Sequence, residues 1–136
     1  MTKPTVTLYD TTLRDGTQGE GVTFTKDEKL ELAKRLDAFG MHYIEGGWPH
    51  PSRPQDIEFF KAARKLKFKQ ARLTSFGSTH RKGVKPAADE GLRAILGTQT
   101  PAVAIFGKSW DLHATKVLRV TLDQNLEMIH DSVRLL

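Results

Sequence analysis

The stretch YDTTLRDGTQGEG, residues 9–21, crowds polar and charged side chains directly after an apolar run. Asp10, Arg14, Asp15 and Gln18 all come from this stretch. Carboxylate oxygens bind divalent cations, and the planar guanidinium of arginine binds carboxylates. The stretch therefore suits a site that holds a metal ion beside a carboxylate-bearing substrate. An ordinary turn with an exposed Arg14–Asp15 ion pair, contributing about 0–1 kcal/mol, is the alternative, because Asp and Gly are common turn formers.

Further polar residues follow the other apolar runs, at points where parallel strands would end. An acidic residue at the end of a buried strand must be paired or bind a ligand, so Glu45 is a second functional candidate. Ligands bind at the carboxyl ends of strands in barrels and in open parallel sheets alike. The remaining candidates at such ends are Thr74, Ser75, Lys108, Ser109 and Trp110.

Several other conspicuous residues fit structural roles. Gly46 and Gly47, with the following WPHP, are expected to shape a turn, and Phe106 and Trp110 are expected to lie in the core. The histidines lack the H-x-H or H-x₃-H spacing of paired metal ligands; they are His42, His50, His80, His113 and His130. Taken singly, none of them is predicted to bind a metal ion.

Four short apolar runs alternate with helical patterns along the chain. The runs cover residues 6–9, 43–44, 71–76 and 102–106. Between the first two, Thr25 and Glu28 can form a capping box, and Gly40 follows the last apolar residue. These signals predict a helix over residues 26–39.

Apolar residues at helical spacing indicate three more helices. The first lies within residues 52–66, with Pro54 in its first turn, and the second lies within residues 85–96. The last covers residues 122–136 and carries one apolar stripe, made of Leu122, Leu126, Ile129, Val133 and Leu136. Such a stripe is typical of a helix that packs on a core.

Four βα units in series predict parallel strands joined by right-handed crossovers. The length of the units is close to the ~31 residues per unit of a (β/α)₈ TIM barrel. The predicted fold class is therefore α/β of the TIM-barrel type, with residues 1–136 as the N-terminal half of a catalytic domain and its first four βα units. A doubly wound sheet is the competing architecture, but GTQGEG does not follow the G-x-G-x-x-G pattern of its phosphate-binding turn.

The length of 136 residues, 38% of them hydrophobic and 27% charged, fits one globular domain. No run of about 18 apolar residues is present and the N-terminus lacks the apolar segment of a secretory signal, so we expect no membrane span. The absence of cysteine excludes cysteine-bound zinc and cysteine nucleophiles, and it agrees with a cytoplasmic location. The net charge of +5 could indicate nucleic-acid binding, but no nucleic-acid-binding motif accompanies it. Binding of an anionic small substrate or of the phosphates of CoA would explain the charge equally well.

Three motifs together resemble a known enzyme family. They are YDTTLRDGTQ at residues 9–18, YIEGGWP at residues 43–49 and FGKSWDLH at residues 106–113. The first resembles metal-dependent condensing enzymes and lyases of the Claisen type, in the isopropylmalate synthase and homocitrate synthase family. The other two are similar to the citramalate synthase branch of that family, and the resemblance covers essentially the whole chain.

The resemblance implies an acyltransferase that joins acetyl-CoA to a 2-oxo acid, here pyruvate, giving (R)-citramalate and CoA. By motif position it implies that Asp15 binds a divalent metal ion (Mg, Mn or Zn) and that Arg14 steadies the oxyanion on the 2-oxo acid. Gln18 would line the substrate pocket, and Glu45 matches the acidic residue that completes the family's catalytic Asp-Arg-Glu set. A homo-oligomer is expected as well.

The sequence departs from the family pattern at the metal site. The family also uses an H-x-H pair on a later strand, and these 136 residues contain none. Because catalytic metals usually have three protein ligands, we expect no turnover from this chain alone. The alternatives are a related 2-isopropylmalate or homocitrate synthase, an enzyme like HMG-CoA lyase, and a non-catalytic half-barrel that serves in assembly.

Overall fold

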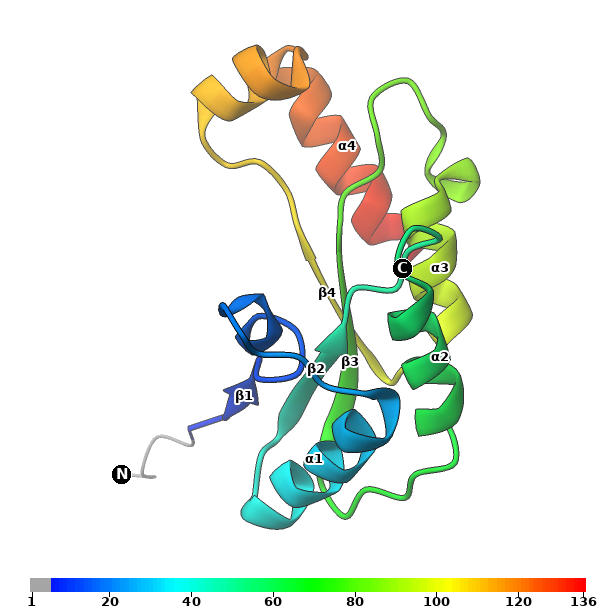
Figure 1. The fold of residues 1–136 in the computed structure, drawn as a ribbon. Helices are drawn as coiled ribbons and strands as arrows, with labels where there is room; N and C mark the ends of the chain where they lie inside the picture. The colour runs from blue at the N-terminus through cyan, green and yellow to red at the C-terminus, as the bar shows by residue number, and fades with distance from the viewer. Residues whose placement is uncertain (1–5) are drawn as a thin grey trace, which may run out of the picture.

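The computed structural model describes residues 6–136, so the prediction that no secretory signal is present falls partly outside it, on residues 1–5. The described residues form a four-stranded parallel sheet in the order β1-β2-β3-β4 (Figure 1). The strands are β1 (Tyr9–Asp10), β2 (Tyr43–Gly47), β3 (Arg72–Ser78) and β4 (Ala102–Phe106). Each strand pairs with the next one in sequence, which confirms the predicted α/β fold of the barrel type.

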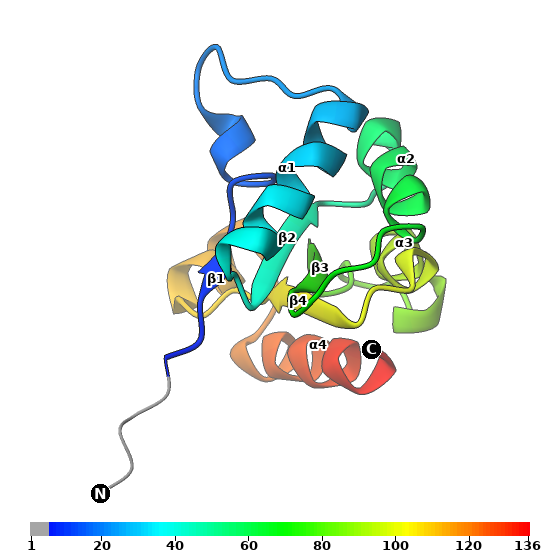
Figure 2. The ribbon, with the colours of Figure 1, turned by 90° about the horizontal axis from the view of Figure 1, so that it is seen from below.

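In this part of the chain four helices follow the strands, and Figure 2 shows them in an arc around the sheet. They are α1 (Lys26–Phe39), α2 (Pro54–Ala63), α3 (Glu90–Thr98) and α4 (Leu122–Leu135). The loops contain the 3-10 turns η1 (Gly16–Gln18) and η2 (Pro86–Ala88) and the π-helical turn η3 (His113–Leu118). Within residues 6–136 no helix is long and apolar enough to cross a membrane.

Helix α1 begins and ends at the predicted residues, because its end signals are local. The Thr25 side chain accepts a hydrogen bond from the Glu28 backbone N–H, and the Glu28 side chain accepts one from the Thr25 N–H, which is the predicted capping box. Gly40 ends the helix with a φ of 106°, a value that glycine adopts without steric cost. The main core lies between this layer of helices and the sheet, with these side chains at its centre: Leu13, Ala33, Ile44, Phe59 and Phe60.

Gly46 and Gly47 belong to β2, so the prediction that they form a turn is wrong. Their role is to let α2 approach the sheet. A Cβ atom on Gly46 would lie 2.5 Å from the Phe59 ring, and one on Gly47 would lie 2.7 Å from the Asp56 carboxylate. Larger residues would therefore push α2 away from β2.

Strand β3 extends to Ser78, beyond the end predicted from its apolar run. Thr74 and Ser75 consequently lie inside the strand and not at its carboxyl end, where they were predicted. Gly77 also belongs to the strand. A Cβ at this position would lie 2.4 Å from the Ile95 side chain, so the glycine lets α3 pack directly against the strand backbone. The small residues of this stretch carry no apolar signal although they are part of the sheet.

Helix α4 forms where predicted, but its apolar stripe does not face the core. Leu122, Leu126 and Val133 are 51%, 63% and 60% exposed. Phe106 and Trp110, which were also expected in the core, are 38% and 56% exposed. An apolar stripe thus identified the helix correctly but not the face that the described structure buries.

Polar contacts orient α4 on the rest of the chain. Its buried residues are Asn125, Met128 and Ser132. The Asn125 side-chain amide donates to the backbone carbonyl of Lys108 at 2.7 Å, after β4. The Ser132 hydroxyl accepts from the backbone N–H of His80 at 3.0 Å, after β3. The helix is therefore attached through the loops at the strand ends, beside which Figure 1 shows it. Its leucine and valine face stays exposed in the described structure.

We predict that the chain on its own self-associates through this uncovered apolar face of α4, since large exposed apolar patches are typical of interfaces. The double substitution Leu126→Glu and Val133→Glu should shift it toward the monomer, because burying the new carboxylates is costly. Sedimentation velocity over a range of concentrations measures the change. Phe39→Glu, at a 79% exposed position on α1, is the matched control and should leave association unaltered. A wild-type chain that stays monomeric would contradict the prediction.

Asp37, near the end of α1, holds the segment that enters β3. Its carboxylate accepts backbone N–H bonds from Lys69 at 2.7 Å, Gln70 at 3.0 Å and Ala71 at 2.8 Å. Burial acts to raise the pKa of the Asp37 carboxyl, but the three N–H donors and the Lys69 charge outweigh it and hold that pKa below its ordinary value. The folded state therefore favours the ionised form.

We predict that Asp37→Asn lowers the free energy of unfolding by about 1–3 kcal/mol near neutral pH. Because the pKa of Asp37 is lower in the folded state, its contribution is complete above the ordinary carboxyl pKa of about 4 and is lost as the pH falls through the folded value. Urea unfolding at neutral and acidic pH should show the gap between the two proteins narrowing in acid. Asp27→Asn, which replaces an exposed carboxylate at the start of α1, is the control. A gap that does not change with pH would be evidence against this account.

Candidate active site at the carboxyl ends of the strands

The loop after β1 folds back over the carboxyl ends of the strands. The backbone N–H groups of Arg14, Asp15 and Gly16 all donate to the carbonyl oxygen of Thr11. Asp10 is used within the same loop, because its carboxylate accepts the N–H of Thr12 at 3.0 Å and the Thr12 hydroxyl at 2.9 Å. This local turn directs Arg14 toward β2 and β3.

Glu45 is the centre of the site and is only 2% exposed. Its Oε1 accepts from Arg14 Nε at 2.5 Å, and its Oε2 accepts from the Tyr9 hydroxyl at 2.5 Å. The two partners come from the first strand and its loop, more than thirty positions earlier in the chain. A buried carboxylate is stable only with such partners, so these two bonds fix the loop relative to the sheet.

The guanidinium of Arg14 is held on three sides. It lies over the ring of Phe76 with its central carbon 4.0 Å from the ring centroid. Besides the Nε bond to Glu45, its Nη1 donates to Asp15 Oδ1 at 2.9 Å. Within residues 6–136 its Nη2 has no hydrogen-bond partner. Arg14 therefore has one free donor group, in a fixed plane, for an anionic ligand.

Tyr9 was not predicted as a site residue. Burial raises the pKa of the Tyr9 hydroxyl well above its usual range; the hydrogen bond and charge of Glu45 raise it further, and the Arg14 charge opposes them. The hydroxyl thus stays protonated and donates to Glu45. The alternation of side chains along strands was the available signal, since Tyr9 pairs in register with Tyr43 and so lies on the same face as Glu45.

Asp15 and Gln18 lie at the outer side of Arg14. The side chain of Asp15 is 57% exposed, and only its Oδ1 is hydrogen-bonded within the described residues. Gln18 is exposed; its backbone N–H donates to the Asp15 carbonyl at 2.9 Å, and within the described residues its side chain has no hydrogen bond to Arg14, Asp15 or Glu45. It lines a cavity of about 300 Å³ whose walls also include Arg14, Lys26, Lys29 and Arg53. The structure therefore brings the side chains of Arg14, Asp15 and Glu45 together, and Gln18 is joined to them only through its backbone.

The candidates from β3 divide between the two faces of the sheet. Thr74 pairs in register with Glu45, and its hydroxyl bonds to the Arg72 carbonyl at 3.3 Å. Ser75 faces the helices instead, where its hydroxyl lies 3.0 Å from the hydroxyl of Thr100. The period of two along a strand requires this division, so the two residues could not both belong to the site.

An aromatic group that was not predicted lies beside Arg14. Phe76 stacks on Phe106 with ring centroids 5.7 Å apart, and Trp48 contacts both rings edge to face. The ammonium of Lys108 lies 5.0 Å from the Phe106 ring centroid. Ser109 and Trp110 are exposed and make no contact with these rings. Two aromatic rings of the site thus each carry a cation, Arg14 over Phe76 and Lys108 over Phe106.

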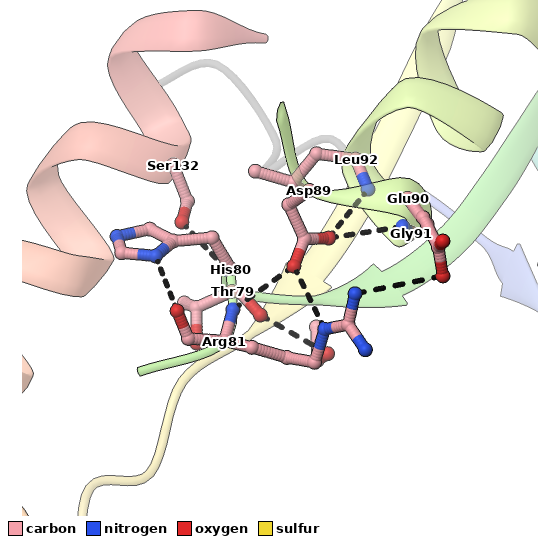
Figure 3. A network of polar contacts seen from close by, with 9 residues as sticks. Thr79, His80, Arg81, Asp89, Glu90, Gly91, Leu92 and Ser132 are labelled. Atoms are coloured by element: carbon pink, nitrogen blue, oxygen red, sulfur yellow. Dashed lines mark hydrogen bonds and ion pairs between the residues drawn. The ribbon is translucent and has the colours of Figure 1, made fainter. Parts of the chain in front are cut away.

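The loop after β3 is tied to α3 and α4 by the polar network shown in Figure 3. Asp89 accepts the N–H groups of Arg81, Gly91 and Leu92. Burial would raise the pKa of the Asp89 carboxyl, but these donors and the Arg81 side chain hold it below its usual value. His80, 8% exposed, donates its backbone N–H to Ser132, while its Nε2 has no partner in the described structure. The network supports the strand end and contributes no group to the Arg14 cluster.

A divalent metal ion needs several oxygen or imidazole ligands close together. Residues 6–136 contain no group of three or more His, Asp or Glu side chains that could hold one. Of the two carboxylates that the described structure places on Arg14, Asp15 fits better as a ligand, because its Oδ2 has no hydrogen bond and its side chain is exposed. The carboxylate of Glu45 is less accessible, since it is only 2% exposed and is paired with Arg14.

The successive parallel βα units define the class as an α/β fold of the barrel type, and the arginine–carboxylate cluster lies at the end of the sheet where such folds bind their ligands. The chain belongs to the HMGL-like family, whose model matches residues 5–136.

Similar proteins narrow the comparison within that family. The chain is 52% identical over 131 residues to an (R)-citramalate synthase of Aquifex aeolicus, covering 96% of this chain and 25% of that protein. It is 48% identical to the (R)-citramalate synthase of Geobacter sulfurreducens, with the same coverage. A 2-isopropylmalate synthase of Oceanobacillus iheyensis is 34% identical over 122 residues, covering 90% of this chain and 22% of that protein. The chain thus spans about a quarter of the length of these relatives.

Solved structures support the fold. The hydroxymethylglutaryl-CoA lyase of Pseudomonas aeruginosa matches with a TM-score of 0.65 and 23% identity, over 90% of this chain and 39% of that chain. An HMG-CoA lyase of Acinetobacter baumannii, solved with coenzyme A and 3-methylmalate, matches with a TM-score of 0.67 and 18% identity, over 94% and 40%. At these identities the likeness establishes the barrel-type fold only.

We predict that Glu45→Gln lowers the free energy of unfolding by about 2–4 kcal/mol, because the largely buried Arg14 would lose its counter-charge. Urea unfolding at one fixed protein concentration measures the loss. Asp15→Asn is the matched control: it removes the other carboxylate on Arg14, but from an exposed position, so its effect should stay within about 1 kcal/mol. If the two variants lost equal free energy of unfolding, the buried Arg14–Glu45 pair would stabilise the fold no more than the exposed Arg14–Asp15 pair does.

Proposed function

We propose that the protein to which this chain belongs condenses acetyl-CoA with pyruvate to give (R)-citramalate and CoA. The observation that carries the proposal is the Arg14–Asp15–Glu45 cluster, in a chain up to 52% identical to (R)-citramalate synthases. Since the chain spans about a quarter of those relatives, the complete activity also requires residues outside it. A homo-oligomer and a cytoplasmic location remain predictions.

The reaction forms one carbon–carbon bond and breaks one thioester. The methyl carbon of acetyl-CoA loses a proton and attacks the ketone carbon of the 2-oxo acid; the carbonyl electron pair moves to oxygen, which then takes a proton. Hydrolysis of the thioester by water releases CoA. Negative charge develops on the ketone oxygen during the attack, so a fixed cation beside that oxygen lowers the barrier.

Arg14 is the group suited to this task. Its guanidinium is held by Glu45, Asp15 and the Phe76 ring, and its Nη2 is free to donate to the ketone oxygen or to the carboxylate of the 2-oxo acid. A donor whose position is fixed in advance needs no reorganisation when charge develops. Gln18 would add a neutral polar group to the same pocket.

Asp15 would hold the divalent metal ion through its free Oδ2, together with ligands from elsewhere in the protein. A divalent cation bound there would polarise the ketone carbonyl as a Lewis acid. Its identity among Mg, Mn and Zn depends on those other ligands.

In this proposal, Glu45 acts through Arg14 and does not touch the substrate. Each of its oxygens accepts a short hydrogen bond, one from Arg14 and one from Tyr9, which suits this carboxylate to holding the arginine. The proposal assigns no residue of the Arg14 cluster as the general base. The predicted catalytic role of Glu45 becomes one of positioning.

A 2-isopropylmalate synthase is the second candidate, supported by the 34% identity to the protein from Oceanobacillus iheyensis. The two candidates differ only in the side chain of the 2-oxo acid. A CoA-release assay of the complete protein with pyruvate, 2-oxoisovalerate and 2-oxoglutarate separates them. Preference for pyruvate supports the citramalate proposal, and preference for another acid overturns it.

We predict that Asp15→Asn lowers turnover of the complete protein by several orders of magnitude, because losing a charged ligand weakens metal binding and ketone polarisation together. Arg14→Lys should be severe as well, since an ammonium group cannot reproduce the planar fork. CoA release at saturating metal measures both. Asp123→Asn, in the exposed first turn of α4, is the control. Near-normal turnover of Asp15→Asn would refute the ligand assignment, and a full-rate lysine variant would make Arg14 an ordinary loop ion pair.

A further inference from the structure

The hydroxyl of Tyr9 occupies a position that neither the sequence motifs nor the proposed chemistry accounts for. It donates to Glu45 Oε2 at 2.5 Å, across 36 residues of sequence and from the neighbouring strand. The opposite oxygen of the same carboxylate accepts from Arg14. Without the Tyr9 hydroxyl, Oε2 of a 2% exposed glutamate would lose its only donor in the described structure.

We propose that Tyr9 is a positioning residue of the 2-oxo acid site: its hydroxyl locks the Glu45 carboxylate in the orientation that aims the free Nη2 of Arg14 at the anionic substrate. The inference rests on the proposed function, since it assigns Tyr9 to the binding of that substrate. Tyr9 acts through two partners and does not itself touch the reacting atoms.

The geometry of the carboxylate supports this role. A glutamate side chain has a final torsion that rotates over a broad range, so one hydrogen bond to Arg14 leaves the carboxylate plane free to turn. A second donor on the other oxygen removes that freedom. When both oxygens of the carboxylate are fixed, the Nε–H of Arg14 must point along its bond to Oε1 of Glu45. The Phe76 ring, which lies against the guanidinium, then limits how that group can turn about this bond.

Tyr9 is also poorly placed to act as a core residue. Its side chain is 43% exposed and lies outside the main core cluster. Its ring stacks only on Tyr43, with centroids 5.9 Å apart and an angle of 25° between the planes. The hydroxyl is the part of the side chain that makes a specific buried contact. The raised pKa of this hydroxyl fits a permanent donor, which orients a carboxylate, and not a proton carrier.

Tyr43 provides a matched control inside the same protein. It is the other tyrosine of the chain and the other ring of the stack. Its hydroxyl accepts only a long bond, 3.5 Å, from Arg72, and it does not contact Glu45. Tyr9→Phe and Tyr43→Phe each remove one oxygen atom from the same pair of stacked rings, but only the first removes a donor to Glu45.

A spectroscopic test addresses the bond itself and needs no substrate. With ¹³C at the ring carbon that carries the hydroxyl, the two tyrosines of the 136-residue chain give two NMR signals, assigned by the two phenylalanine variants. Glu45→Gln should move the Tyr9 signal and leave the Tyr43 signal in place, and the Tyr9 hydroxyl should then ionise at lower pH. A Tyr9 signal that does not respond to Glu45→Gln overturns the proposal.

A kinetic test addresses the role in the complete protein. Tyr9→Phe should raise KM for the 2-oxo acid about tenfold while KM for acetyl-CoA stays unchanged, and Tyr43→Phe should alter neither. If the two variants had equal effects, or if Tyr9→Phe raised the KM for acetyl-CoA as much as the KM for the 2-oxo acid, Tyr9 would be only a structural residue and the proposal would be overturned. A wild-type protein that turns over no 2-oxo acid would instead refute the proposed function, and the positioning role with it; normal turnover with an unaffected Tyr9→Phe refutes the positioning role alone.

Discussion

The burial of the Glu45 carboxylate is the constraint on which the rest of the site depends. A charged group removed from water is tolerated only where hydrogen bonds and an opposite charge compensate its lost hydration. Here both oxygens are bonded, one to Arg14 and one to Tyr9. The loop after β1 must therefore return over the sheet, and the Asp10 turn and the convergence of three N–H groups on Thr11 are the means by which it does so.

The same constraint reaches the helix layer through the end of β2. Gly47 has no side chain, so Asp56 of α2 comes close to the strand and accepts the Trp48 backbone N–H at 3.2 Å. Asp56 is in turn paired with the buried Lys29 of α1 at 2.8 Å. The ion pair thus joins α1 to α2, and the hydrogen bond from Trp48 joins Asp56 to the end of the strand that carries Glu45. A change in the packing of either helix would move the carboxylate that fixes the arginine.

Local signals in the sequence predicted what is locally determined. The caps of α1 were correct at both ends because they are made by neighbouring residues, and β4 matched its apolar run because a short run of apolar residues favours a strand. Arg14 and Asp15 follow β1, and Glu45, which was predicted to follow its strand, lies within the neighbouring β2; parallel pairing of the two strands brings the three residues together. The side of α4 that is buried could not be predicted, because Asn125 and Ser132 attach it through backbone groups of distant loops. Tyr9 and Phe76 were missed for a related reason. Both are aromatic strand residues, and they acquire a role only through the hydrogen bond of Tyr9 to Glu45 and the contact of Phe76 with Arg14.

The balance of charge in the cluster relates its geometry to its proposed chemistry. Arg14 carries one positive charge, and Asp15 and Glu45 carry one negative charge each, so the cluster alone has a formal excess of one negative charge. A 2-oxo acid adds its own carboxylate, and condensation adds negative charge on the ketone oxygen. Arg14 cannot offset all of these, because its charge is already shared with two carboxylates. On the proposed function, a divalent cation held by the exposed oxygen of Asp15 would offset much of this negative charge. The buried carboxylate would then orient the arginine and the exposed one would bind the metal, although both lie within hydrogen-bonding distance of the same guanidinium.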